Sequence, residues 1–107
     1  MAPWTQRGWA LMLAGACAGW VALAFTRSEG VARTFGTTPS EIRALGVRDA
    51  GSAVFLALSP DPRPAIGVRV AFDLADTARY GRAGRGAVAY TLGFAAFGAL
   101  GLLGRRG

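Results

Sequence analysis

The 107-residue chain has no histidine, no lysine and only one cysteine, Cys17. A lone cysteine excludes a disulfide within the chain, and without histidine a zinc site lacks its usual ligands. Nucleophilic catalysis by a Ser/His or Cys/His pair is excluded as well. The sequence therefore indicates no catalytic residue, no metal site and no cofactor, and we predict that the protein is not an enzyme.

Charged residues are also scarce. They make up 17% of the chain, against 52% hydrophobic residues and 16 glycines. A soluble domain of this length would need a larger polar share to cover its surface. Small residues instead suit the close approach of helices in lipid. The composition therefore predicts a single integral membrane domain over residues 1–107.

The net charge of +6 comes entirely from arginine. A nucleic-acid-binding protein more often gathers its basic residues in one stripe beside a polar, aromatic-bearing face. Here the arginines are spread along the chain. Those at the ends of apolar segments can keep their stems in lipid and their guanidinium groups in water. We therefore expect membrane lipid as a partner, and no nucleic acid.

Four apolar segments follow one another, at about residues 9–25, 39–58, 65–80 and 87–103. The first and the last are almost uninterrupted, and each reaches the roughly 17 residues needed to cross a bilayer. A cleaved signal peptide is an alternative for the first segment, but the three apolar segments downstream favour a retained helix. The sequence thus predicts an all-α fold, a four-helix transmembrane bundle.

Helix signals mark the start of the second segment. Thr38 is a suitable N-cap, Pro39 suits the first helical position, and Glu41 stands three residues after the cap. Residues 26–38 are polar and are predicted to form a loop with at most a short interfacial turn. Three prolines within residues 59–64 predict a non-helical hairpin between the second and third segments.

The two central segments carry charged residues, Arg48 and Asp49 in one and Arg69, Asp73 and Asp76 in the other. Counting about ten residues outward from the hairpin places Arg48 and Asp49 level with Asp73 and Asp76, about 15 Å from the turn and near the middle of a hydrocarbon core about 30 Å thick. A lone charge there costs at least about 2.5 kcal/mol, so opposite charges should pair. We predict that Arg48 pairs with Asp73 or Asp76. Arg69 is expected to neutralise another carboxylate, including that of Asp73 four residues away.

This Arg/Asp cluster has two interpretations. It is either a buried clamp that fixes the register of the helices or a polar pocket that binds a headgroup or small ligand, or relays protons. Ionisable residues inside a membrane favour a function, whereas the near balance of acids and arginines favours a clamp. Both interpretations stay open from the sequence.

Residues 45–80 combine GVRD at 46–49, a hairpin rich in proline and arginine, and DLAD at 73–76. This pattern resembles a family of small bacterial four-helix membrane proteins of unknown function, the DUF4267 type, and more distantly the DoxX-like membrane proteins. The resemblance covers roughly a third of the chain closely. It implies a four-helix integral membrane fold and no established activity. The family-defining positions that it implies are Gly46, Arg48, Asp49, Asp73 and Asp76.

We predict a multi-pass protein of the bacterial inner membrane in which the Arg/Asp cluster clamps the bundle and is a candidate site for a lipid or small polar ligand. One alternative is an accessory subunit of a membrane redox or transport complex, or a homo-oligomer, packed through Gly15 and Gly19 or through the glycine-rich fourth helix. Another is a small proton-coupled transporter. Small multidrug transporters use an acid in their first helix, and residues 9–25 contain none. The count of arginines weakly favours both termini outside.

Overall fold

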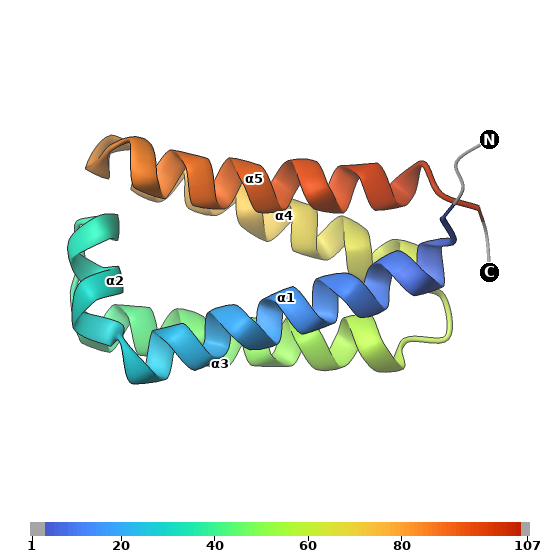
Figure 1. The fold of residues 1–107 in the computed structure, drawn as a ribbon, viewed down its shortest axis with the longest axis horizontal. Coiled ribbons are helices and arrows are strands. Elements are labelled where there is room, and N and C mark those ends of the chain that lie inside the picture. Colours follow the sequence, from blue (N-terminus) through green and yellow to red (C-terminus); the bar gives the residue numbers. More distant parts are fainter. Residues whose placement is uncertain (1–3, 106–107) are drawn as a thin grey trace.

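The computed structural model describes residues 4–105, and their regular secondary structure is helical. The predicted all-α class is therefore confirmed. The α-helices, drawn in Figure 1, are α1 (Gln6–Thr26), α2 (Ser28–Phe35), α3 (Pro39–Leu58), α4 (Pro62–Tyr80) and α5 (Arg85–Leu102), with a 3-10 turn at Gly81–Ala83.

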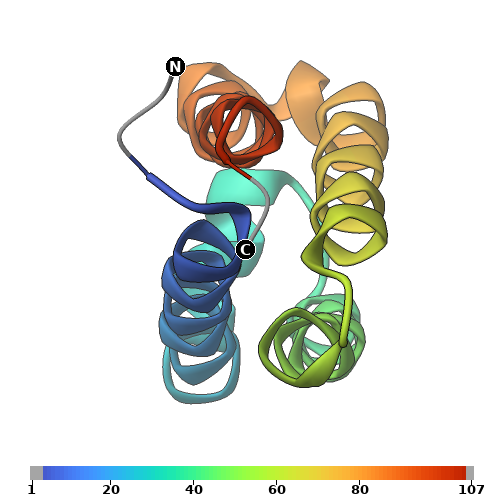
Figure 2. The ribbon, with the colours of Figure 1, turned by 90° about the vertical axis from the view of Figure 1, so that its right-hand side faces the viewer.

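The four long helices run side by side along the 40 Å length of the molecule and occupy the corners of the end-on view in Figure 2. α2 crosses the end of the bundle that lies opposite the termini. The closest packing is between α1 and α3 and between α4 and α5. α3 and α4 follow one another in the chain but touch over a smaller area, so other interactions must hold them together.

The predicted start of α3 is confirmed. The Thr38 hydroxyl accepts a hydrogen bond of 3.2 Å from the backbone N–H of Glu41, and Pro39 occupies the first turn. The Thr38 hydroxyl satisfies a backbone N–H that has no acceptor inside the helix, and Pro39 has no N–H to satisfy.

The prediction that the hairpin extends to residue 64 is wrong, because α4 begins at Pro62. The Asp61 carboxylate accepts a hydrogen bond from the backbone N–H of Arg63 and caps the helix. Pro62 and Pro64 both lie in the first turn, where a helical N–H has no acceptor. Proline costs no hydrogen bond there, and its fixed φ favours the helical conformation.

The predicted loop before α3 is also wrong over residues 28–35, which form α2. Ala32 and Phe35 on one side of this short helix are buried. The Phe35 ring packs against the rings of Trp20 and Tyr80, each at a centroid distance of 5.6 Å. Gly36 then ends the helix with a φ of 65°, a left-handed conformation that glycine adopts without strain. The fold is thus four long helices with a fifth, amphipathic one across their end.

Two helices, α1 and α5, are long and apolar enough to cross a membrane by length and composition. Core helices of soluble proteins and signal sequences meet the same criterion, so it defines candidates only. α3 and α4 carry the charged residues of the Arg/Asp cluster and do not meet it.

The ends of the described chain are joined by hydrogen bonds. The backbone N–H of Gln6 donates to the carbonyl of Arg105 at 2.7 Å, and the N–H of Arg105 donates to the carbonyl of Trp4 at 3.0 Å. The indole N–H of Trp9 donates to the carbonyl of Phe97 at 2.6 Å. These bonds tie the start of α1 to the end of α5.

Gly98 allows α5 to pack closely on α4. A Cβ atom added at this position would stand 2.7 Å from Cγ2 of Val70, and the β-branched valine has little freedom to turn away. Gly93, on the same helix, has no such neighbour within 4 Å.

We expect Gly98→Ala to lower the free energy of unfolding by about 1–3 kcal/mol, because the added methyl overpacks the contact between α4 and α5. Gly93→Ala is the matched control and should leave stability unchanged or raise it, since alanine favours a helix. Thermal unfolding of the purified protein in detergent measures both. Equal midpoints for the two variants would contradict the close packing at Gly98.

Candidate functional site: the Arg/Asp cluster

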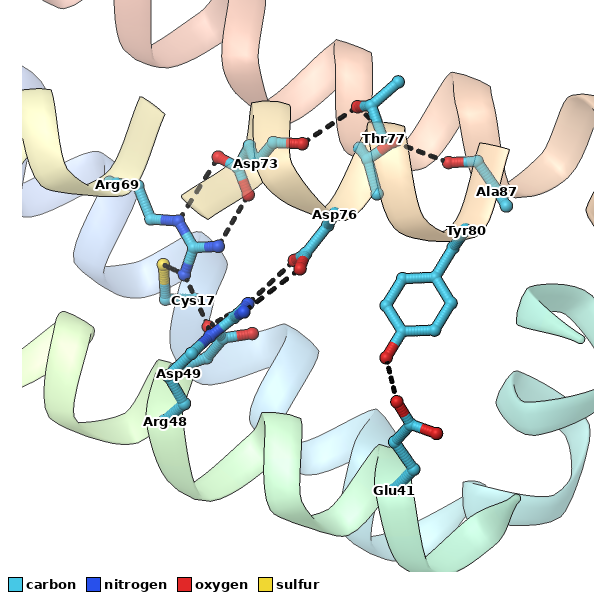
Figure 3. Close-up of polar contacts among 11 residues, drawn as sticks. Cys17, Glu41, Arg48, Asp49, Arg69, Asp73, Asp76, Thr77, Tyr80 and Ala87 are labelled. Atoms are coloured by element: carbon cyan, nitrogen blue, oxygen red, sulfur yellow. Dashed lines mark hydrogen bonds and ion pairs between the residues drawn. The ribbon is translucent and has the colours of Figure 1, made fainter. Parts of the chain in front are cut away.

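Arg48 joins α3 to α4. Its guanidinium donates two hydrogen bonds to the carboxylate of Asp76, Nη1 to Oδ1 at 3.0 Å and Nη2 to Oδ2 at 2.7 Å (Figure 3). This bidentate geometry is the strongest form of an Arg–carboxylate pair. Of the two partners predicted for Arg48, the structure selects Asp76.

Arg69 also contacts two helices. Its Nη2 and Nε donate to the two oxygens of Asp73 at 2.6 and 3.2 Å, at the predicted four-residue spacing in α4. Its Nη1 donates to Oδ1 of Asp49 on α3 at 2.9 Å. The pairing of Arg69 with Asp73 is therefore confirmed, and a second pair to Asp49 is added.

Asp49 connects the two arginines. Its Oδ1 accepts from Nη1 of Arg69 and also from Nε of Arg48, each at 2.9 Å. The second oxygen, Oδ2, accepts no hydrogen bond from residues 4–105, and in Figure 3 no dashed line reaches it. The five side chains thus form one continuous network, in the order Asp76, Arg48, Asp49, Arg69 and Asp73.

The cluster is buried at its centre and reaches the surface at one edge. The side chains of Asp49 and Arg69 are each 3% exposed, and that of Asp73 is 5% exposed. Arg48 is 28% exposed and lies over the ring of Phe72, with Cζ 4.7 Å from the ring centroid. Removing buried charges from water is costly, so this arrangement is stable only because each guanidinium meets carboxylates on more than one side.

Residues of α1 and α5 also lie around the Arg/Asp cluster, and they were not predicted as site residues. Cys17 of α1 places its sulfur 3.6 Å from Nη1 of Arg69 and accepts a hydrogen bond. The hydroxyl groups of Thr77 and Thr91 lie 2.7 Å apart and link α4 to α5. Trp20 follows Cys17 at a three-residue spacing on the buried side of α1. That spacing was the one available signal, and it is equally typical of a simple core face.

A small cavity lies against the cluster. Its walls include the aromatic side chains of Trp20, Phe35, Tyr90 and Phe94, and the carboxylates face it from the other side. The volume open to water is about 20 Å³, which is room for about one water molecule. Trp20 is 7% exposed, and its indole N–H has no hydrogen-bond partner among the described residues.

A second polar network lies nearer to α2. The Tyr80 hydroxyl donates to Oε1 of Glu41 at 2.5 Å, as Figure 3 shows. Thr37 also bonds to the Glu41 carboxylate, and Arg79 forms an ion pair with it. Glu41 and Arg79 balance each other in charge, so this network adds no net charge beside the Arg/Asp cluster.

Comparisons with protein-family models, curated proteins and solved structures find no match to this chain. The resemblance to the DUF4267 and DoxX-like families therefore stays a prediction that rests on residues 45–80. Among residues 4–105, no three or more His, Cys, Asp or Glu side chains are grouped so that they could hold a metal ion.

We expect Arg69→Met to lower the free energy of unfolding by about 3 kcal/mol or more, because the carboxylates of Asp49 and Asp73 lose their shared buried partner. Arg79→Met, on the exposed side of the same helix, is the matched control and should leave the unfolding midpoint nearly unchanged. Denaturant or thermal unfolding in detergent tests the difference. A variant at residue 69 that is as stable as the control would show that the cluster does not hold α3 and α4 together.

Proposed function

We propose that the protein is a non-enzymatic, multi-pass integral membrane protein of the bacterial inner membrane. In this proposal all four long helices cross the bilayer, and the Arg/Asp cluster clamps them and is the candidate site for a lipid or small polar ligand. The observation that carries the proposal is the distribution of polarity: charged side chains are buried between helices whose outward faces expose large apolar side chains.

The outward apolar side chains come from every long helix, including the two that carry the charges. α3 exposes Val54 and Leu58, and α4 exposes Val68 and Leu74. A soluble bundle has the opposite arrangement, with apolar side chains inside and charges outside. Contiguous apolar surface on all sides is instead suited to lipid. Further exposed apolar side chains are Leu11, Met12, Leu23, Val47, Phe55, Leu92 and Leu100.

Helix length also agrees with this proposal. The long helices have 21, 20, 19 and 18 residues in chain order. At a rise of about 1.5 Å per residue they extend over roughly 27–32 Å, close to a hydrocarbon core of about 30 Å. α3 and α4 are the costly helices to insert, and pairing of their charges inside the bundle reduces that cost.

The ends of the bundle differ in basic residues. Arg43 in the first turns of α3 reaches the Ser28 hydroxyl at 3.3 Å, so it belongs to the α2 end. Arg7 donates to the carbonyl of Pro60 at 2.7 Å and belongs to the opposite end. Since arginine is retained on the cytoplasmic side, we propose that the α2 end faces the cytoplasm. Among the described arginines outside the cluster, the α2 end has Arg27, Arg33, Arg43, Arg79, Arg82 and Arg85, and the opposite end has Arg7, Arg63 and Arg105.

A specific observation also favours the alternative of a subunit or homo-oligomer. Gly15 and Gly19 lie on the exposed side of α1, and a Cβ atom at either would meet nothing within 4 Å. The predicted Gly-x-x-x-Gly contact is therefore not used inside the bundle. The two glycines leave a strip of α1 without side chains, on which another membrane helix could pack closely.

Cysteine labelling tests whether α3 and α4, the two helices that carry the charges, cross the bilayer. In a Cys17→Ser background, we expect Ser40→Cys and Arg82→Cys at the α2 end to react with a membrane-impermeant maleimide from the cytoplasmic side only. Arg63→Cys, beside the turn between α3 and α4, should react from the opposite side only. The side chains at positions 40, 63 and 82 are all exposed in the structure, so a difference in labelling reports the side of the membrane and not burial in the protein.

Labelling of Arg63→Cys and Ser40→Cys from the same side would contradict the crossing of α3. Release of the protein from membranes by alkaline carbonate would contradict integral insertion altogether. A swap of the two sides for all three positions would overturn only the proposed orientation.

A further inference from the structure

The Arg/Asp cluster has an excess of negative charge. When all five side chains are ionised, two arginines face three aspartates, which leaves a net charge of −1. The nearest further ion pair, between Glu41 and Arg79, is itself balanced and supplies no positive charge. A net charge at membrane depth is unfavourable even when its neighbours are well paired.

One carboxylate oxygen is available to remove this charge. Both oxygens of Asp73 accept from Arg69, and both oxygens of Asp76 accept from Arg48. A proton on any of these four oxygens would displace an arginine donor. Oδ2 of Asp49 accepts no hydrogen bond from the described residues, so a proton can bind there without breaking an ion pair.

The cavity supplies a second, independent indication of an occupant. The indole N–H of Trp20 is buried and has no acceptor among the described residues, although this side chain lines the same cavity as Asp49. A buried donor without an acceptor is unfavourable, so an acceptor is expected beside it. The free volume of about 20 Å³ admits a water molecule and excludes larger organic cations.

We propose that the cluster binds one exchangeable proton on Asp49, next to a buried water that accepts from the Trp20 indole. A hydronium ion of the solvent transfers its proton to Oδ2 of Asp49, an O–H bond forms, and a neutral water is left. The net charge of the cluster changes from −1 to zero. This inference rests on the proposed function, since burial in lipid is what makes the excess charge unfavourable.

All five α-helices contribute side chains around Asp49. α2 contributes Phe35, which does not titrate. The titratable or charged groups that face Asp49 are Cys17 of α1, Arg48 of its own helix, Arg69, Asp73 and Asp76 of α4, and Tyr90 of α5. Cysteine and tyrosine are ordinarily neutral at neutral pH, so they do not change the net charge of the cluster.

Infrared spectroscopy of the full chain in phosphatidylcholine vesicles tests the proposal, because a protonated carboxyl group absorbs apart from a carboxylate. We expect one protonated carboxyl per chain at neutral pH, lost as the pH is raised. Asp49→Asn leaves two acids and two arginines, so its band should disappear completely. Glu29→Gln, which removes an exposed acid of α2, is the matched control and should keep the band.

Two further variants keep the test decisive. If Asp49→Asn does not fold, Asp76→Asn at the edge of the cluster also equalises the charges and should also lose the band. Trp20→Phe keeps every charge and should keep the band but shift its position, because the water loses its donor. An absent band in the wild type, or a band that persists in a folded Asp→Asn variant, would overturn the proton site. An unshifted band in Trp20→Phe would overturn the bridging water.

The cysteine-labelling experiment separates this inference from the proposed function. If labelling confirms that α3 and α4 cross the bilayer and the wild-type spectrum has no such band, only the proton site is wrong. If α3 and α4 do not cross, the proposed function is wrong whatever the spectrum shows.

Discussion

Arg69 lies between two carboxylates from different helices, and the arrangement of the bundle depends on that position. Its bonds to Asp73 hold the guanidinium along α4, and the remaining nitrogen then meets Asp49 of α3. Arg48 makes the reciprocal connection from α3 to Asp76. α3 and α4 have little direct packing in common, and these crossed ion pairs are the buried polar link between them.

Apolar packing groups the four long helices into two pairs, α1 with α3 and α4 with α5. α1 packs closely on α3 because Gly46 brings α3 against Ala24 and Phe25, and α5 packs closely on α4 at Gly98. Each pair is held by small residues and van der Waals contact, which is how helices associate in lipid. The Arg/Asp cluster then joins one pair to the other. The cavity lies at this junction.

Much of this arrangement could be predicted from the sequence, because it depends on local rules. The cap at Thr38 follows from local helix signals, and the position of a turn rich in proline places Arg48 level with Asp73 and Asp76. The choice of Asp76 between these two acids was not predicted and comes from the structure. α2 could not be predicted in this way, since it forms where Phe35 is buried against Trp20 and Tyr80, which are distant in sequence. The cavity was also beyond prediction, because it depends on how α1 and α5 are rotated about their own axes. An apolar helix offers few signals of that rotation.

The hydrogen bonds of Arg105 with Trp4 and Gln6 place the two ends of the described chain side by side. A short peptide linker would therefore be enough to connect them, and the connection between α4 and α5 lies at the other end of the bundle. Opening the chain there would yield a circular permutant with the same helices in a new order. In such a permutant α5 would precede α1, while both ion pairs between α3 and α4 would keep their original chain separation.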